Sequence, residues 1–162
     1  MITVKDEGVN INLREPTPED QPFLLEVYAS TRLDELEGLE WDENQKLTFI
    51  KMQFLARERT YPRVDNRIIV FNGRDVGRIL VDRTDTAISL TDIALLTDYR
   101  NAGIGTRLIQ DLMTEASASG KPLKLHVLET SPAVRLYERL GFSRTGFEAA
   151  YLEMTWLPPV PN

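Results

Sequence analysis

Apolar and polar positions along the chain repeat with two different periods. A period of two is typical of half-buried strands, in which successive side chains point to opposite faces. Strands are predicted at Val9–Leu13, Arg67–Phe71, Val76–Val81, Thr86–Leu96 and Leu123–Leu128. The dipeptide Asn72-Gly73 joins two of these runs and predicts a tight hairpin turn. Phe142–Trp156 is predicted to form a closing hairpin around Gly146.

A period near 3.6 residues predicts four helices. The first opens at Thr17-Pro18, where a capping hydroxyl precedes a proline, and the second covers Glu43–Arg59 and ends at Tyr61-Pro62. The third begins at Ile104 and is stopped by Gly120, and the fourth opens at Ser131-Pro132 and is stopped by Gly141. Their apolar stripes are Phe23, Leu24, Val27 and Tyr28; Leu47, Ile50 and Phe54; Leu108, Ile109, Leu112, Met113 and Ala116; and Ala133, Leu136, Tyr137 and Leu140.

Strands and helices alternate without repeats or an internal linker, which predicts one α/β domain with a mixed sheet over residues 1–162. Residues 158–162 form a Pro-rich tail. No apolar run approaches the roughly 20 residues that span a bilayer, and Met1–Glu7 lacks the pattern of a signal peptide. We therefore expect a cytoplasmic protein with no membrane partner.

Composition narrows the chemistry further. The chain has no cysteine and one histidine, which excludes disulfides, thiolate catalysis and multi-histidine metal sites, so no metal cofactor is expected. A net charge of −6 argues against a nucleic-acid partner. Acidic residues crowd the segment Asp34–Glu43, which contains Trp41. This segment is either a solvated loop or a mouth that attracts a cationic substrate.

A glycine-containing turn lies between a predicted strand and the third helix. Its sequence Arg100-Asn101-Ala102-Gly103-Ile104-Gly105-Thr106 places two glycines at a helix start, where free N–H groups suit an anion. A dinucleotide fold would require a third glycine where Leu108 stands, and a nucleoside triphosphate loop would require Gly-Lys-Ser/Thr. The remaining interpretation is an acyl-CoA carrier, whose diphosphate also suits a helix start.

Two segments carry a resemblance to a known family. Ile93–Gly105 resembles motif A of the GCN5-related N-acetyltransferases (GNAT), and Ser131–Phe142 resembles motif B of the same superfamily, in the family's order and near its usual spacing. The resemblance covers nearly the whole chain. It implies a mixed sheet of six to seven strands with a V-shaped split between strands 4 and 5, flanked by about four helices.

The same resemblance implies how the donor, acetyl-CoA, is bound. Its pantetheine arm pairs with the main chain of Ile93, Ala94 and Leu95, and its diphosphate meets backbone amides of Arg100, Asn101, Ala102, Gly103, Ile104, Gly105 and Thr106. Motif B often begins with an asparagine that helps to hold the pantetheine. Ser131 occupies this place here, and its shorter side chain can make one such bond.

Catalytic roles are assigned as hypotheses. Direct transfer needs a neutral amine and a proton for the departing thiolate. Motif B implies Tyr137 as general acid at the CoA sulfur, although Tyr137 also lies on an apolar stripe. The N–H group of Leu95 is suited to the oxyanion. Asp92, His126 and Glu129 are candidates for the base, and a chain of waters serves this purpose in some family members.

The resemblance thus implies an acetyl-CoA-dependent N-acetyltransferase that acts directly on a primary amine of a small molecule or peptide. Acids near the amine pocket would favour a cationic acceptor, and the family is often dimeric, so a homodimer is expected. Two alternatives stay open. One is a non-catalytic CoA-binding or regulatory module, because Asp92 is equally compatible with holding its strand end and His126 with a surface role. The other is transfer of a longer acyl group, or transfer to a hydroxyl.

Overall fold

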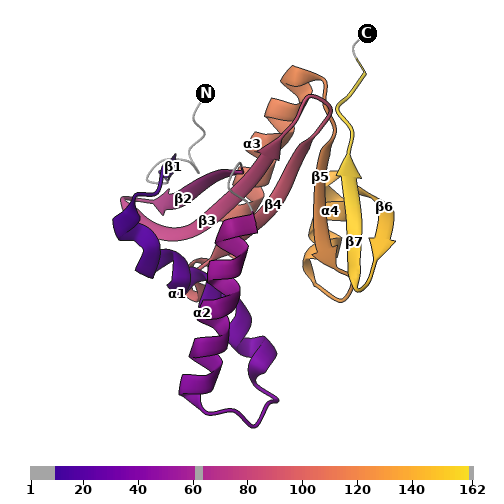
Figure 1. Ribbon diagram of the computed structural model, residues 1–162. Coiled ribbons are helices and arrows are strands. Elements are labelled where there is room, and N and C mark those ends of the chain that lie inside the picture. The colour runs from indigo at the N-terminus through magenta and orange to yellow at the C-terminus, as the bar shows by residue number, and fades with distance from the viewer. Residues whose placement is uncertain (1–9, 61–63, 161–162) are drawn as a thin grey trace. The chain divides into compact units, whose positions relative to one another are not determined.

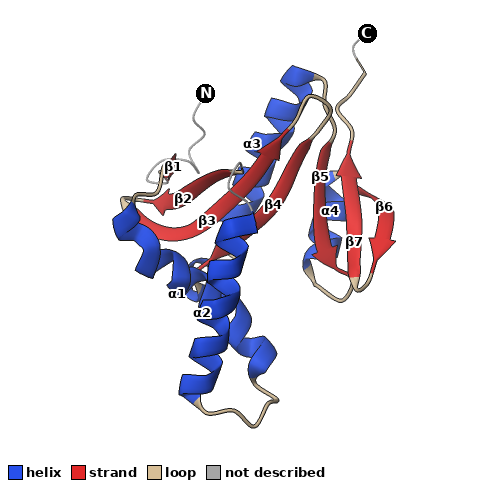
Figure 2. Ribbon diagram, in the orientation of Figure 1, coloured by secondary structure: helices blue, strands red, loops and turns tan. Residues whose placement is uncertain are grey.

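The computed structural model describes residues 10–60 and 64–160, apart from the side chains at 34, 35 and 60 (Figure 1). The helices are α1 Gln21–Arg32, α2 Glu43–Thr60, α3 Ile104–Ser119 and α4 Ala133–Leu140 (Figure 2). The strands are β1 Ile11–Arg14, β2 Asp65–Phe71, β3 Arg74–Arg83, β4 Ile88–Leu95, β5 Leu123–Leu128, β6 Ser143–Glu148 and β7 Tyr151–Trp156. Tyr61-Pro62, predicted to end the second helix, lies outside the described residues, as does Val9.

The strands form one seven-stranded sheet in the order β1-β2-β3-β4-β5-β7-β6. Strands β4 and β5 are parallel and pair over Ile88–Leu90 with Leu123–Leu125, whereas β7 is antiparallel to both β5 and β6. The predicted mixed sheet with four helices is therefore confirmed for the described residues. None of the helices in 10–60 and 64–160 is both long and apolar enough to cross a bilayer.

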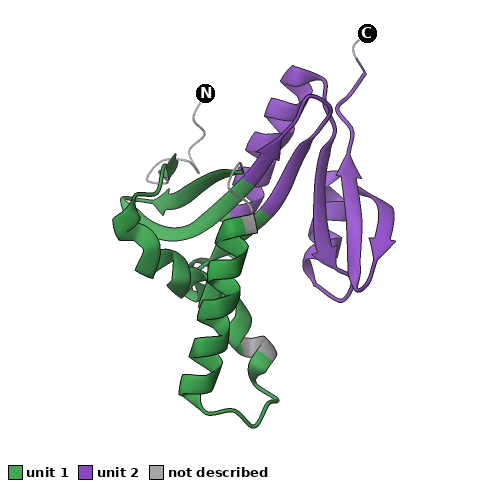
Figure 3. Cartoon of the chain, viewed as in Figure 1, with its two compact units in different colours: residues 1–80, 92–104 green, residues 81–91, 105–162 purple. Residues whose placement is uncertain are grey.

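The chain divides into two compact units (Figure 3). Unit 1 comprises Met1–Leu80 and Asp92–Ile104, and unit 2 comprises Val81–Thr91 and Gly105–Asn162. Strands β3 and β4 each contribute residues to both units.

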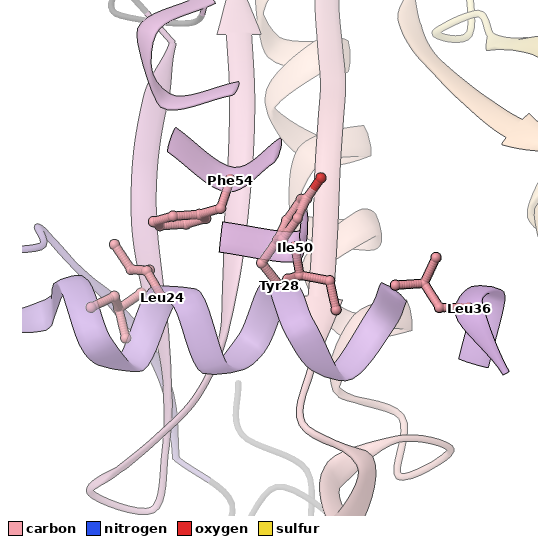
Figure 4. Packing of buried hydrophobic residues seen from close by; sticks show 6 residues of the cluster. Leu24, Tyr28, Leu36, Ile50 and Phe54 are labelled. Atoms are coloured by element: carbon pink, nitrogen blue, oxygen red, sulfur yellow. The ribbon is translucent and has the colours of Figure 1, made fainter. Parts of the chain in front are cut away.

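The core of unit 1 is built by α1, α2 and β2. Tyr28 of α1 packs against Phe54 of α2 with 5.7 Å between the ring centroids (Figure 4). The remaining buried members of the cluster are Leu24, Leu36, Ile50 and Ile68. Helix α1 follows a short 3-10 turn, Pro18–Asp20, in which the Asp20 carboxylate accepts a hydrogen bond of 2.7 Å from the Thr17 N–H. Leu47, expected on the apolar stripe of the second helix, is exposed, so the buried stripe is shorter than predicted.

Two glycines fix the path of β2, β3 and β4 in unit 1. Asn72 and Gly73 both have positive φ, 49° and 82°, as a two-residue hairpin turn between right-twisted strands requires. Gly77 lies beside the β4 backbone, and a Cβ built on it would lie only 2.2 Å from the carbonyl oxygen of Ala94. The end of β4 can therefore approach β3 closely only because residue 77 has no side chain.

Unit 2 is held by α3 and by β5 and β7. The predicted stripe of α3 is buried at Leu108, Ile109, Leu112 and Ala116, and Leu123, Leu125 and Met154 are buried on the strands. The predicted turn at Gly146 is wrong. Ala149 and Ala150 make the turn, and Gly146 lies within β6 beside a register shift between Arg144 and Gly146, where it packs against Glu153.

The predicted stripe of the fourth helix also needs correction. The buried residue of α4 is Val134, whereas Ala133, Leu136, Tyr137 and Leu140 are half-buried. A helix of eight residues spans little more than two turns, so a single fully buried side chain defines its inner face.

Candidate functional site

The glycine turn is a left-handed entry into helix α3. A 3-10 turn at Thr97–Tyr99 ends β4, and Asn101 and Gly103 then adopt φ values of 61° and 85°. Asn101, Ala102 and Gly103 are exposed, whereas Ile104 is 1% exposed and anchors the first turn of α3. The N–H groups of a first helical turn have no carbonyl partner inside the helix. The turn therefore presents amide donors beside exposed glycine backbone, which suits a phosphate group.

The Arg100 side chain is already hydrogen-bonded within the protein rather than directed towards a phosphate group. Its Nε donates to the carbonyl oxygen of Leu95 at 2.8 Å, and its Nη2 donates to the carbonyl and hydroxyl oxygens of Ser30, both at 3.3 Å. Its backbone N–H donates to Thr97 at 3.2 Å. The Arg100 side chain thus links α1 to the end of β4 through hydrogen bonds. Its backbone N–H is also already bonded, so of the residues predicted to bind the diphosphate with their amides, Asn101 is the first whose N–H is available to an anion.

Strand β4 places Asp92 against helix α2. The Asp92 carboxylate lies 3.2 Å from Nη2 of Arg57, whose guanidinium also lies over the Tyr28 ring at 5.6 Å. Ile93, Ala94 and Leu95 follow directly along the strand and are half-buried. In unit 1, therefore, the candidate base lies on the strand whose main chain is expected to meet the pantetheine arm, but it already has a cationic partner.

A second charge pair in unit 1 was not predicted from the sequence. Arg78 of β3 is 6% exposed, with its Nη1 2.5 Å from the Glu58 carboxylate and its Nε donating to the Asn66 side chain at 2.8 Å. A cavity of about 20 Å³ adjoins these groups, room for roughly one water. Burying a charge requires such partners. No local pattern signals them, because the residues come from three separate elements.

Strand β5 carries the histidine candidate in unit 2. The His126 side chain is 61% exposed, and its Nε2 lies 3.9 Å from Glu153 of β7, beyond hydrogen-bond distance. This exposure agrees with the surface role that the sequence left open for His126. Glu129 is exposed after the strand end and contributes to a pocket of about 390 Å³ with Ser131, Arg135 and Glu138.

Ser131 lies in the connection between β5 and α4 and hydrogen-bonds to both of these elements. Its N–H donates to the Leu128 carbonyl at 2.9 Å, and its hydroxyl oxygen accepts from the Ala133 N–H at 3.1 Å. The hydroxyl hydrogen is still able to donate. Tyr137 lies on α4 one turn after Ala133. Its side chain is half-buried, and its ring centroid is 5.8 Å from that of Phe142. Ser131 thus caps the helix that carries Tyr137.

The acidic segment is largely solvated. Glu37, Glu40, Asp42 and Glu43 are exposed, and the side chains of Asp34 and Glu35 lie outside the description. Asp42 caps α2, because its carboxylate accepts the Gln45 N–H at 2.8 Å while the Gln45 side chain accepts the Asp42 N–H at 3.0 Å.

The predicted site residues fall in both units. Unit 1 contains Asp92, Ile93, Ala94, Leu95, Arg100, Asn101, Ala102, Gly103 and Ile104, and unit 2 contains Gly105, Thr106, His126, Ser131 and Tyr137. Within the described residues there is no cluster of three or more His, Asp or Glu side chains that could hold a metal ion. The structural features that remain for a cofactor are the amides of the glycine turn and the main chain of β4.

Comparison with known proteins identifies the class. The model of the acetyltransferase (GNAT) domain matches residues 64–144, which is half of the chain. The chain therefore belongs to the GNAT acetyltransferase family. The match runs from β2 into β6 and includes the glycine turn and α4.

Solved structures share this fold. One is the PaiA N-acetyltransferase of Thermoplasma acidophilum in complex with coenzyme A, with a TM-score of 0.68 and 17% identity over 91% of this chain and 99% of that chain. Another is the ribosomal-protein-S18-alanine N-acetyltransferase of Escherichia coli, with a TM-score of 0.62 and 20% identity over 95% of this chain and 96% of that chain. An acetyltransferase of Thermus thermophilus gives a TM-score of 0.67 and 17% identity over 91% and 97% of the two chains.

Proposed function

We propose that the protein transfers an acetyl group from acetyl-CoA directly to a primary amine of a small molecule or peptide. The observation that carries this proposal is the glycine turn, in which Asn101 and Gly103 adopt left-handed backbone at the start of α3. In a GNAT chain, such exposed amides suit the diphosphate of CoA. The coenzyme A complex of the Thermoplasma acidophilum relative supports the same donor.

Each donor-binding residue has a role in this proposal. Acetyl-CoA supplies an activated thioester when bound. The amides from Asn101 to Thr106 would bind its diphosphate, and the main chain of Ile93–Leu95 would bind the pantetheine arm, with the Leu95 N–H stabilising the oxyanion. The Ser131 hydroxyl would donate one hydrogen bond to the pantetheine. The Tyr137 hydroxyl would give its proton to the departing sulfur.

The base is proposed from the three candidates. Asp92 is favoured by its position directly before Ile93 on β4, although its carboxylate already lies in an ion pair with Arg57. His126 and Glu129 are both exposed. A water chain to bulk solvent would need none of them.

The test is thiol release from acetyl-CoA across a panel of primary amines, with hydroxyl acceptors and longer acyl-CoA donors included. We expect turnover with an amine and acetyl-CoA, and Tyr137→Phe should lower kcat while leaving the Kd for acetyl-CoA unchanged. Asp92→Asn and His126→Gln, assayed over pH, separate the base candidates, since only loss of the true base removes the acidic limb of the kcat/KM profile. Unchanged turnover in Tyr137→Phe would remove that residue from the reaction.

A non-catalytic CoA-binding module is the second candidate. It is favoured by the Arg57 partner of Asp92 and by the 61% exposure of His126, which leave these two candidates without the surroundings of an activated base. Calorimetric binding of acetyl-CoA together with no thiol release on any acceptor would favour this module over the enzyme.

The acceptor class belongs to the same proposal. The exposed acids Glu37 and Glu40 would attract a cationic amine over distance. Replacing Glu35, Glu37 and Glu40 by glutamine should raise the KM for a polyamine or basic peptide, and this KM should no longer depend on salt concentration. An unchanged KM would exclude the attraction. We further propose that the chain works as one domain, in the cytoplasm, without a nucleic-acid partner.

A further inference from the structure

The last turn of helix α2 forms two ion pairs with strands of unit 1, and it supplies the cation of one and the anion of the other. Arg57 lies 3.2 Å from the Asp92 carboxylate of β4, and Glu58 lies 2.5 Å from the Arg78 guanidinium of β3. Consecutive helical residues point about 100° apart, so a single turn reaches both strands. Because the Glu58 pair ties this turn to β3 by itself, loss of the Arg57 side chain should leave the end of α2 in place.

The two ion pairs differ in how far solvent reaches them. The Arg78 side chain is 7% exposed, whereas the Arg57 and Asp92 side chains are 21% and 30% exposed. A buried guanidinium needs a partner for its charge, so folding alone accounts for the pair of Glu58 and Arg78. An ion pair that water reaches adds little to stability. Folding alone therefore does not account for the pair of Arg57 and Asp92.

The Arg57 guanidinium is itself held in place. Its central carbon lies 5.6 Å from the centroid of the Tyr28 ring, which is 9% exposed and packs against Phe54. The guanidinium is planar and always charged, so it gives the Asp92 carboxylate a fixed direction. The closest contact between them uses one carboxylate oxygen, Oδ2. A carboxylate accepts about four hydrogen bonds, so Asp92 retains capacity for a further donor.

The position of Asp92 on β4 suggests which donor this is. Asp92 directly precedes Ile93–Leu95, the main chain proposed to bind the pantetheine arm, and three residues of strand span about 10 Å. An amine that reaches the thioester near Leu95 therefore comes within reach of the Asp92 carboxylate, directly or through one water. A hydrogen bond to a carboxylate of fixed direction would orient the amine for attack.

We propose that Arg57 is a positioning residue for the acceptor: it holds the Asp92 carboxylate where this group accepts a hydrogen bond from the acceptor amine. This inference rests on the proposed function. Arg57 acts on the reaction only through Asp92, so its effect should vanish when Asp92 is replaced.

A double-variant cycle tests whether Arg57 acts through Asp92. With the amine that gives the fastest thiol release, Arg57→Ala and Asp92→Asn should each lower kcat/KM for the amine by about tenfold or more. The double variant should lose no more than Asp92→Asn alone, because the contact is already absent, whereas independent effects would multiply. The Kd for acetyl-CoA should be unchanged in all three variants.

Rescue separates positioning from a loss of structure. Arg57→Lys keeps the charge and should recover part of the lost kcat/KM. Added methylguanidinium should restore part of the activity of Arg57→Ala, and equal concentrations of urea or tetramethylammonium should not, because neither combines a positive charge with planar N–H donors.

Glu58→Gln is the matched control, because it breaks the neighbouring ion pair on the same turn of α2. It leaves the buried Arg78 without a carboxylate and should lower Tm. It should change neither kcat/KM for the amine nor the response to methylguanidinium. Circular dichroism of each variant establishes that it is folded.

Four results would overturn this inference and leave the proposed function intact. They are an unchanged kcat/KM in Arg57→Ala, a double variant whose loss is the product of the single losses, an equal loss of kcat/KM in Glu58→Gln, and no recovery of Arg57→Ala with methylguanidinium. Absence of thiol release from the wild type with every acceptor would instead refute the proposed function, and this inference with it.

Discussion

Replacing Gly103 by alanine separates backbone strain from cofactor contact at the glycine turn. Gly103 has a φ of +85°, and a Cβ built on it meets no atom within 4 Å. Alanine there has room, so the structural penalty is the left-handed backbone alone, about 1 to 2 kcal/mol. For a chain of this size each kcal/mol lowers Tm by about 2–4 °C.

Gly73 provides the matched control. It has a φ of +82°, and its Cβ likewise meets nothing within 4 Å, but it lies in the turn between β2 and β3. Gly73→Ala and Gly103→Ala should therefore lower Tm by similar amounts. Only Gly103→Ala adds a methyl group where the diphosphate is proposed to approach the amides, and we expect its Kd for acetyl-CoA to rise about tenfold or more, near 1.4 kcal/mol.

Scanning fluorimetry and titration calorimetry measure the two quantities on the same samples. If Gly103→Ala binds acetyl-CoA as tightly as Gly73→Ala does, the diphosphate does not rest on this turn, and the donor site must be sought elsewhere. If both variants lose affinity equally, the loss comes from stability.

Three further perturbations test the framework around the site. Phe54→Ala should lower the free energy of unfolding by about 3–5 kcal/mol in urea titrations, against about 1 kcal/mol or less for the exposed Phe49→Ala, and equal losses would contradict the described core. Arg100→Gln should lower the free energy of unfolding by about 1–3 kcal/mol, because it removes a guanidinium that donates a hydrogen bond to a main-chain carbonyl. An unchanged urea midpoint would exclude this linking role of Arg100. Hydrogen bonds from Arg14 hold the pKa of the Asp20 carboxyl below its usual range, so its stabilisation is present above about pH 4 and is lost as pH falls through the folded pKa. The Tm advantage of the wild type over Asp20→Asn should accordingly be steady from neutral pH to about pH 4 and shrink below it, and an advantage that grows in acid would reverse the assignment.

Local patterns predicted the elements whose boundaries are fixed by local chemistry. The fifth strand was predicted at Leu123–Leu128 and has these bounds, and Asn72-Gly73 forms the predicted turn. Gly146 was mistaken for a turn because a glycine in a strand can also mark a bulge, which is its place in β6. The actual turn, Ala149-Ala150, carries no turn-forming residue types.

The site was less predictable, because its contacts join distant parts of the chain. Asp92 meets a guanidinium 35 positions earlier, and Arg100 meets a serine 70 positions earlier. Periodicity reports which face of an element is apolar and carries no information on such pairings. The sequence could therefore suggest Asp92 as a base but could not show that its carboxylate forms an ion pair with Arg57.

Gly77 has a consequence for how this protein tolerates change. A Cβ at this position would lie 2.2 Å from the Ala94 carbonyl oxygen and 2.9 Å from a methyl group of Leu95, so even alanine must displace the end of β4. In a saturation library scored for activity, every substitution at Gly77 should be depleted as strongly as those at a reacting group. Such a map would mark Gly77 as essential although its part is to leave space, and a designer who recombines β3 and β4 from different relatives must carry this glycine and its opposite strand together.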